Sequence, residues 1–242
     1  MTKRKNVDDV TSNIPGSEGQ SRKYGMSTLA VHAGARPDPV TGARGTPIYQ
    51  TTSFVFDDAE HGAELFNLQT FGYVYSRMTN PTVSVFEERV AQLEGGRGAV
   101  ATSSGHAAQF IAAATLMEAG DEFIASRNLY GGSVTQFGVS FPKLGWKCNF
   151  VDPTDPENFE KAMNDKVKFI FCEGVANPGG IILDLEKISD IAHKHGVLLI
   201  VDNTLASPYL LRPFEWGADL VVHSTTKFIG GHGNTMGGIL IE

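Results

Sequence analysis

The sequence lacks the features that mark several classes of protein. Its only cysteines, Cys148 and Cys172, lie in strand-like segments without a close-spaced partner, so we expect reduced, structural thiols rather than a metal site. With 20 Lys+Arg against 27 Asp+Glu, the net charge is −7, and no basic block follows residues 3–5, so nucleic acid is not an expected partner. No apolar run approaches the roughly 20 residues that span a bilayer, and no secretory leader is visible. We therefore expect a soluble, cytoplasmic protein with no membrane partner.

Three regions differ in composition. Residues 1–25 are polar and lack apolar periodicity, which predicts a disordered tail. Residues 26–80 are rich in Gly, Pro and Thr, with one helix-like stretch near 59–68, and we expect an extended N-terminal arm. Residues 81–242 have the apolar patterns of a folded domain, which we expect to be incomplete at its C-terminal end. The 41% hydrophobic content is enough for a sizeable core.

The third region alternates between strand-like and helix-like patterns. Ser84 and Glu87 have the spacing of a capping box, and the apolar residues that follow recur at helical intervals until Gly95. Helices are also predicted at 107–117 and 184–195, and strands at 99–102, 122–125, 149–151, 167–172, 197–201 and 220–222. This order predicts an α/β fold with a mostly parallel sheet and helices on both faces.

Chemically useful side chains follow these strands, where parallel sheets bind their ligands. Asp202 ends the apolar run 197–201, and a buried acid needs a positive partner. Lys227 follows the next strand, beside Ser224 and Thr226. A lysine near hydroxyls and opposite an acid suits an aldehyde cofactor with a phosphate and a pyridine nitrogen, and pyridoxal phosphate has all three groups.

Two other segments fit the same cofactor. Ser104, Gly105 and His106 follow a strand and open a helix, whose N-terminal N–H groups favour phosphate. Tyr130, at the end of the next strand, can stack on an aromatic ring. Taken singly, each of these residues has an ordinary structural explanation: a cap, a packed ring or a solvated lysine. Their joint occurrence at one edge of the sheet favours the functional interpretation.

A second interpretation rests on Ser224 and Lys227, which have the Ser-x-x-Lys spacing of acyl-enzyme hydrolases. In those enzymes the serine opens a helix, whereas here a strand leads directly into it. No companion Lys-Thr-Gly or Ser-Asp-Asn follows. The histidines offer no metal-ligand spacing, since His193 and His195 lie two apart on a predicted helix and point to different faces.

From about Ser27 onward the chain resembles the Cys/Met metabolism (trans-sulfuration) family of pyridoxal-phosphate enzymes, and within it most closely the O-acetylhomoserine sulfhydrylases. The motifs that carry this resemblance are residues 28–34 (TLAVHAG), 47–53 (PIYQTTS), 75–82 (YSRMTNPT), 93–96 (LEGG), 177–180 (NPGG), 202–204 (DNT) and 224–233 (STTKFIGGHG). One departure is Gly174, where family members commonly have a hydroxyl residue between Glu173 and Asn177.

The resemblance implies a role for each site residue. It makes Lys227 the lysine that bonds the cofactor and shuttles protons, Asp202 the partner of the pyridine nitrogen, and Tyr130 the stacking ring. Asn177 matches the residue near the cofactor's phenolic oxygen. The phosphate would be bound by Ser104, Gly105, His106, Ser224 and Thr226.

The resemblance also implies an assembly and an activity. Tyr75 and Arg77 match a pair that reaches the phosphate of the neighbouring subunit, so a homodimer or homotetramer is expected. The implied fold is the large domain of fold-type I pyridoxal-phosphate transferases, without the C-terminal domain that carries an arginine for the substrate carboxylate. The implied reaction is γ-replacement on O-acetylhomoserine by sulfide or a thiol, giving homocysteine or methionine. Two alternatives stay open: another activity of the family (cystathionine γ-synthase, cystathionine γ-lyase or methionine γ-lyase), and a non-catalytic fragment.

Overall fold

The computed structural model describes residues 24–242, in two compact units that meet in sequence between Gln92 and Leu93. The predicted tail at 1–25 thus lies almost wholly outside the described residues. The boundary between the units falls later than residue 81, where the sequence suggested that the cofactor domain begins. The division into tail, arm and cofactor domain stays a prediction.

The first unit contains two short helices and most of a third. They are α1 (Met26–His32), α2 (Ala59–Phe66) and α3 (Pro81–Glu94), whose last two residues belong to the second unit. Asp58 caps α2 by accepting a hydrogen bond from the His61 N–H. Long segments without regular structure separate these helices, so this unit is built mainly of loops.

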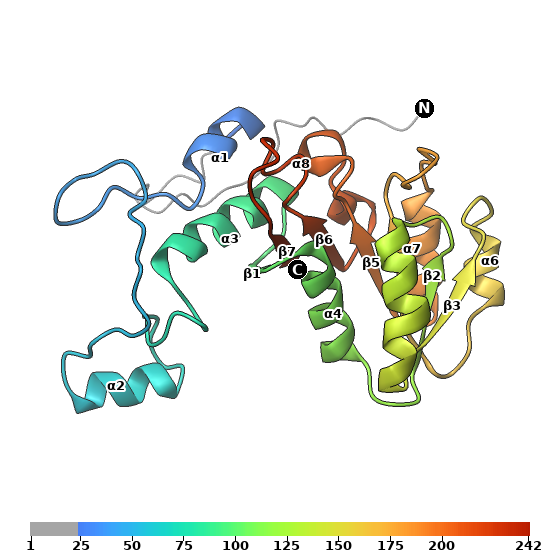
Figure 1. Cartoon of the computed structure of the whole chain (residues 1–242), viewed down its shortest axis with the longest axis horizontal. Coiled ribbons are helices and arrows are strands. Elements are labelled where there is room, and N and C mark those ends of the chain that lie inside the picture. Colours follow the sequence, from blue (N-terminus) through green and yellow to red (C-terminus); the bar gives the residue numbers. More distant parts are fainter. Residues whose placement is uncertain (1–23) are drawn as a thin grey trace. The chain divides into compact units, whose positions relative to one another are not determined.

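A seven-stranded sheet forms the centre of the second unit (Figure 1). Its strands are β1 (Ala99–Thr102), β2 (Glu122–Ser126), β3 (Lys147–Val151), β4 (Val167–Glu173), β5 (Leu198–Asp202), β6 (Leu220–Ser224) and β7 (Gly238–Ile241). They are arranged in the order β1-β7-β6-β5-β4-β2-β3. The strands from β6 to β3 are parallel to their neighbours, whereas β7 is antiparallel to both β1 and β6. The predicted mostly parallel α/β sheet is confirmed.

Helices connect these strands. They are α4 (Gly105–Leu116), α5 (Gly131–Thr135), the π-helix η1 (Gln136–Ser140), the 3₁₀-helix η2 (Phe141–Leu144), α6 (Glu157–Lys161), α7 (Leu185–Lys194), α8 (Ser207–Leu210) and the 3₁₀-helix η3 (Pro213–Trp216). None of the helices within residues 24–242 has both the length and the apolar character that crossing a lipid bilayer requires.

Alternating strand residues build two cores, one on each face of the sheet. Phe169 and Phe171 of β4 pack in one cluster with Phe123, Phe137 and the alanines of α4. The intervening residues, such as Ile170, point to the opposite face and are equally buried. There α7, with its buried Ile188, packs against β5. Both faces of the sheet are therefore covered, and the carboxyl ends of β4, β5 and β6 are left to carry polar residues.

Candidate cofactor site

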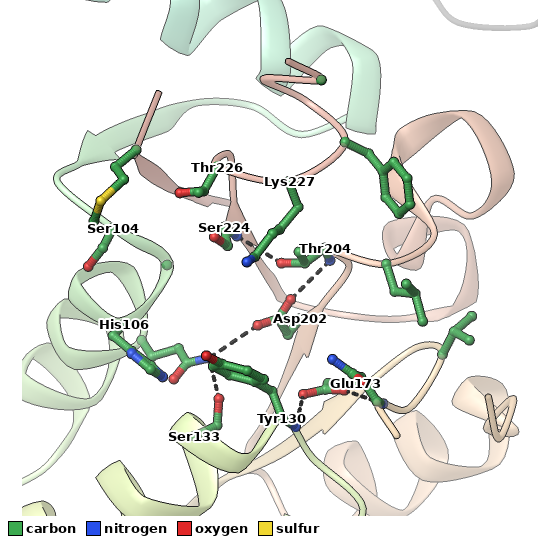
Figure 2. Close-up of a pocket in the computed structure, with 18 of the residues that line it drawn as sticks. Ser104, His106, Tyr130, Ser133, Glu173, Asp202, Thr204, Ser224, Thr226 and Lys227 are labelled. Carbon is green, nitrogen blue, oxygen red and sulfur yellow. Dashed lines mark hydrogen bonds between the residues drawn. The ribbon is translucent and has the colours of Figure 1, made fainter. Parts of the chain in front are cut away.

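A cavity of about 750 Å³ opens where β4, β5 and β6 end. Every predicted site residue of the second unit lines it: Ser104, Gly105, His106, Tyr130, Asn177, Asp202, Ser224, Thr226 and Lys227. Figure 2 shows Lys227 and Asp202 pointing toward each other across this space, with Ser224 and Thr226 beside the lysine. Residues far apart in the sequence thus come together because parallel strands end at one edge.

Two neutral donors fix the carboxylate of Asp202. One oxygen accepts a hydrogen bond from the Thr204 N–H at 2.9 Å, and the other accepts one from the Gln109 amide at 3.1 Å. The Gln109 amide also donates to the Ser133 hydroxyl at 3.1 Å, and Gln109 itself is buried. Within the part of the chain that the structure describes, no cation pairs with this carboxylate, so its charge is available to a positive group in the cavity.

Lys227 lies in the turn that follows β6. Its backbone N–H donates to the Ser224 carbonyl at 3.3 Å, and the Ser224 N–H donates to the Thr204 hydroxyl at 2.8 Å. The Thr226 hydroxyl is held by both polar atoms of the Gly237 backbone. No ion pair or hydrogen bond of the Lys227 amine is found within residues 24–242, so the amine is free to react.

The N-terminus of α4 lies directly against the end of β6. Ser104 caps the helix by accepting a hydrogen bond from the Ala107 N–H at 3.1 Å. A Cβ atom at Gly105 would lie 2.8 Å from Ser224 Cβ, and one at Gly238 would lie 2.1 Å from the Ser104 carbonyl oxygen. Only residues without a side chain permit this approach, which places helix N–H groups and hydroxyls side by side. Such a combination suits a phosphate group.

Tyr130 presents its ring beside His106 at the cavity wall. The two rings are stacked, with centroids 5.8 Å apart and planes 26° apart. Gly132 makes this packing possible, because a Cβ atom there would lie within 2.6 Å of the Tyr130 ring. Half of Tyr130 remains exposed, so the ring is available for a further stacking partner.

Glu173, the last residue of β4, also lines the cavity. It is only 5% exposed, and burial is the main cause that raises the pKa of its carboxyl to about 7. The negative charge of Asp202 raises this pKa further, whereas hydrogen bonds from the Tyr130 and Asn177 N–H groups lower it. A buried carboxylate without a cation is costly, and its presence at the cavity needs an explanation.

The sequence interpretation assigned no role to Gln109, Ser133, Glu173 or Thr204, all of which line the cavity. Gln109 could have been found as the single long polar side chain within the apolar helix α4. Tyr75 and Arg77 belong to the first unit, where the Arg77 guanidinium lies 5.5 Å from the Tyr75 ring centroid. That any of these residues binds a cofactor stays a prediction.

Comparisons with known proteins identify the family of the chain. Residues 27–242 match the Cys/Met metabolism PLP-dependent enzyme family. The chain belongs to this family. An O-acetyl-L-homoserine sulfhydrylase of Leptospira meyeri is 50% identical over 94% of this chain and 52% of its own length. A homocysteine synthase of Schizosaccharomyces pombe is 48% identical over 90% of this chain and 51% of its own length.

Solved structures of relatives show the same fold. A Campylobacter jejuni protein, described as an O-acetylhomoserine (thiol)-lyase and carrying N'-pyridoxyl-lysine-5'-monophosphate, superposes with a TM-score of 0.88. It is 39% identical, and the match covers 91% of this chain and 54% of that one. The expected large domain of fold-type I enzymes is thereby confirmed. The chain spans about half the length of the curated relatives it matches.

The residues that line the cavity of this Cys/Met metabolism family member fit pyridoxal phosphate. The free Lys227 amine, the oriented Asp202 carboxylate and the half-exposed Tyr130 ring match its aldehyde, pyridine nitrogen and ring face. Because Gly105 and Gly238 have no side chains, the start of α4 lies close to the end of β6, with helix N–H groups next to hydroxyls that suit the phosphate. The lining of the cavity therefore suits the aldehyde, the pyridine nitrogen, the ring and the phosphate of this cofactor.

Proposed function

We propose that this chain is the cofactor-binding part of a pyridoxal-phosphate-dependent enzyme that catalyses γ-replacement on O-acetylhomoserine. Sulfide or a thiol would replace acetate, giving homocysteine or methionine. The observation that carries this proposal is the convergence of Lys227, Asp202 and Tyr130 on one cavity beside the N-terminus of α4. The O-acetyl-L-homoserine sulfhydrylase at 50% identity and the homocysteine synthase at 48% identity support this reaction over others of the family.

Each residue has a defined task in this proposal. The cofactor, when bound, supplies an electron sink next to the α-carbon of an amino-acid substrate. The Asp202 carboxylate, oriented by its hydrogen bonds from Thr204 and Gln109, would favour a positive charge on the pyridine nitrogen. Tyr130 holds the ring plane by stacking. The Lys227 amine would hold the cofactor and would accept and return the substrate's proton.

The remaining residues bind the polar ends of the cofactor. Ser104, Gly105, His106, Ser224 and Thr226 would surround the phosphate, and Asn177 would face the phenolic oxygen. Tyr75 and Arg77 would act on the phosphate of a neighbouring copy in a homodimer or homotetramer. These roles follow from the family resemblance, and the cavity supports those of the second unit by bringing the residues together.

Reductive trapping tests the cofactor site. The purified chain is mixed with pyridoxal phosphate, reduced with borohydride, and digested for peptide mass spectrometry. We expect the added mass on Lys227 and its loss in Lys227→Arg, which keeps the charge but cannot form the bond. Lys143 does not line the cavity, so the control variant Lys143→Arg should keep the label on Lys227. Label scattered over surface lysines in the wild-type chain would contradict the proposal.

Turnover assays separate the proposed reaction from its alternatives. The chain loaded with pyridoxal phosphate, and not treated with borohydride, is supplied with O-acetylhomoserine and sulfide, with cystathionine, or with methionine, against free cofactor as the baseline. Homocysteine formed from the first pair supports the sulfhydrylase assignment. Preferential breakdown of cystathionine or methionine indicates another activity of the family. Labelling at Lys227 without turnover of any of the three indicates a fragment that binds the cofactor but does not catalyse.

A further inference from the structure

Glu173 joins two loops that approach the cavity from different strands. One carboxylate oxygen accepts the Tyr130 N–H, from the loop after β2, at 2.6 Å. The other accepts the Asn177 N–H, from the loop after β4, at 2.8 Å. β2 and β4 are neighbours in the sheet. Along the chain, however, Tyr130 lies 43 residues away from Glu173. A single side chain therefore fixes one loop against the other.

Only an ionised carboxylate can make both bonds well. Both contacts require an acceptor, and a carboxylate offers one on each oxygen. A protonated carboxyl group or a glutamine amide has one good acceptor and one donor, so one of the two N–H groups would face a donor. The structure shows no other hydrogen bond from these two N–H groups within the described residues.

The charges around Glu173 come from several elements. Asp202 at the end of β5 opposes its ionisation, as burial does. The Lys227 amine, the His106 imidazole and the Tyr130 phenol line the same cavity from the β6 turn, α4 and the β2 loop. Cys172 precedes it on β4, and burial raises the pKa of that thiol, which stays neutral. Glu173 thus lies where burial and Asp202 disfavour its negative charge. A carboxylate at such a position does not serve to stabilise the fold, which indicates another role.

We propose that Glu173 is a positioning residue of this site: its ionised carboxylate holds the Tyr130 and Asn177 loops together and so sets the Tyr130 ring over the cavity. The proposal rests on the proposed function for the meaning of the cavity, but the contact itself belongs to the chain without cofactor. Glu173 touches neither the reacting atoms nor the cofactor in this proposal, and it acts through the two backbone N–H groups.

The test follows the backbone amides of Tyr130 and Asn177 by NMR in the chain without cofactor. Their proton shifts should move together between pH 5.5 and 8.5 with one midpoint near 7, downfield as Glu173 ionises. In Glu173→Gln both titrations should disappear. The matched control is Glu122→Gln, which alters a carboxylate bonded by Lys147, Asn149 and Asn164 at the start of β2. It should leave both titrations unchanged.

A second measurement connects the loops to the cofactor. Spectroscopic titration with pyridoxal phosphate at pH 8 should give a dissociation constant about tenfold higher for Glu173→Gln than for the wild type, because one buried N–H loses its acceptor. Glu122→Gln should bind like the wild type. Circular dichroism checks that both variants are folded. Glu173→Asp keeps the charge but is one carbon shorter, so its dissociation constant should lie between those of the wild type and Glu173→Gln.

The outcomes distinguish this proposal from the proposed function. Amides that do not titrate in the wild type, or that titrate equally in Glu173→Gln, overturn the positioning role. Unchanged affinity in Glu173→Gln overturns it as well. If the wild-type chain takes no label at Lys227 but both amides titrate through Glu173, the loop contact stands and the proposed cofactor chemistry is wrong.

Discussion

At the scale of single residues, the cavity contains two carboxylates in contrasting environments. Asp202, the last residue of β5, accepts hydrogen bonds on both oxygens from neutral donors. Glu173 is bound in the same way, but deeper burial raises its pKa to about 7. The first carboxylate is oriented toward the cavity, and the second is directed at backbone N–H groups of the loops. Two acids of similar chemistry thus differ in what they face.

The raised pKa of Glu173 predicts how stability depends on pH. In the unfolded chain its pKa returns to about 4.3, so between about 4.3 and 7 the folded chain binds more protons than the unfolded chain. The free energy of unfolding should therefore fall as pH rises through this window, by up to about 4 kcal/mol from this group. Urea unfolding at pH 5, 6, 7 and 8 measures this slope in the chain without cofactor.

Two variants isolate the contribution of Glu173. Glu173→Gln should show a flatter slope than the wild type, because it removes the group that titrates. Glu122→Gln should keep the wild-type slope, since hydrogen bonds from Asn149 and Lys147 hold the pKa of Glu122 below its usual range and it stays ionised in this window. Identical slopes in the wild type and Glu173→Gln would show that another group dominates.

At the scale of elements, the close approach of α4 to β6 depends on Gly105. Replacing it with alanine places a Cβ atom 2.8 Å from Ser224 Cβ and 2.9 Å from Ser224 Cα, so the helix must shift. We expect Gly105→Ala to lower the free energy of unfolding by about 1–3 kcal/mol and to weaken cofactor binding. Gly98→Ala, where nothing lies within 4 Å of the added atom, is the control and should be neutral. Thermal unfolding of both variants decides whether the contact is as tight as the structure shows.

The elements were also the level at which the sequence was most informative. The buried run before Asp202 predicted a strand ending at the site, and β5 ends there at Asp202. The sequence did not predict that β7 lies antiparallel between β1 and β6. The apolar pattern of residues 238–241 does not specify which strands pair with β7. Gln109 and Glu173 were missed for a similar reason. Their partners Asp202 and Tyr130 lie 93 and 43 residues away, and no local pattern encodes such a contact.

At the scale of the whole molecule, the proposed role of Tyr75 and Arg77 predicts complementation between copies. Arg77→Ala alone should take little borohydride-fixed cofactor, and Lys227→Ala alone should take none at that position. Co-expression of the two should restore label on the Arg77→Ala chain, because its Lys227 would be served by an intact Arg77 from the other copy. Peptide mass spectrometry distinguishes the two chains by their mutated peptides.

Two results would contradict this arrangement. Full labelling of Arg77→Ala alone would show that the arginine is dispensable, and no recovery on co-expression would show that it acts within its own chain. Arg44→Ala, an exposed arginine of the same unit, controls for a general loss of positive charge and should label like the wild type.

The pairing of β1 with β7 also bears on how the molecule is made. β1 ends at Thr102, but the one strand that pairs with it among residues 24–242, β7, begins at Gly238. On a ribosome, β1 would therefore emerge long before the strand that anchors it to the sheet. Gly238 also lies against Ser104, at the wall next to α4. A nascent chain would thus complete this wall of the cavity only when β7 has been made, so we expect the proposed capture of a cofactor to follow the synthesis of β7.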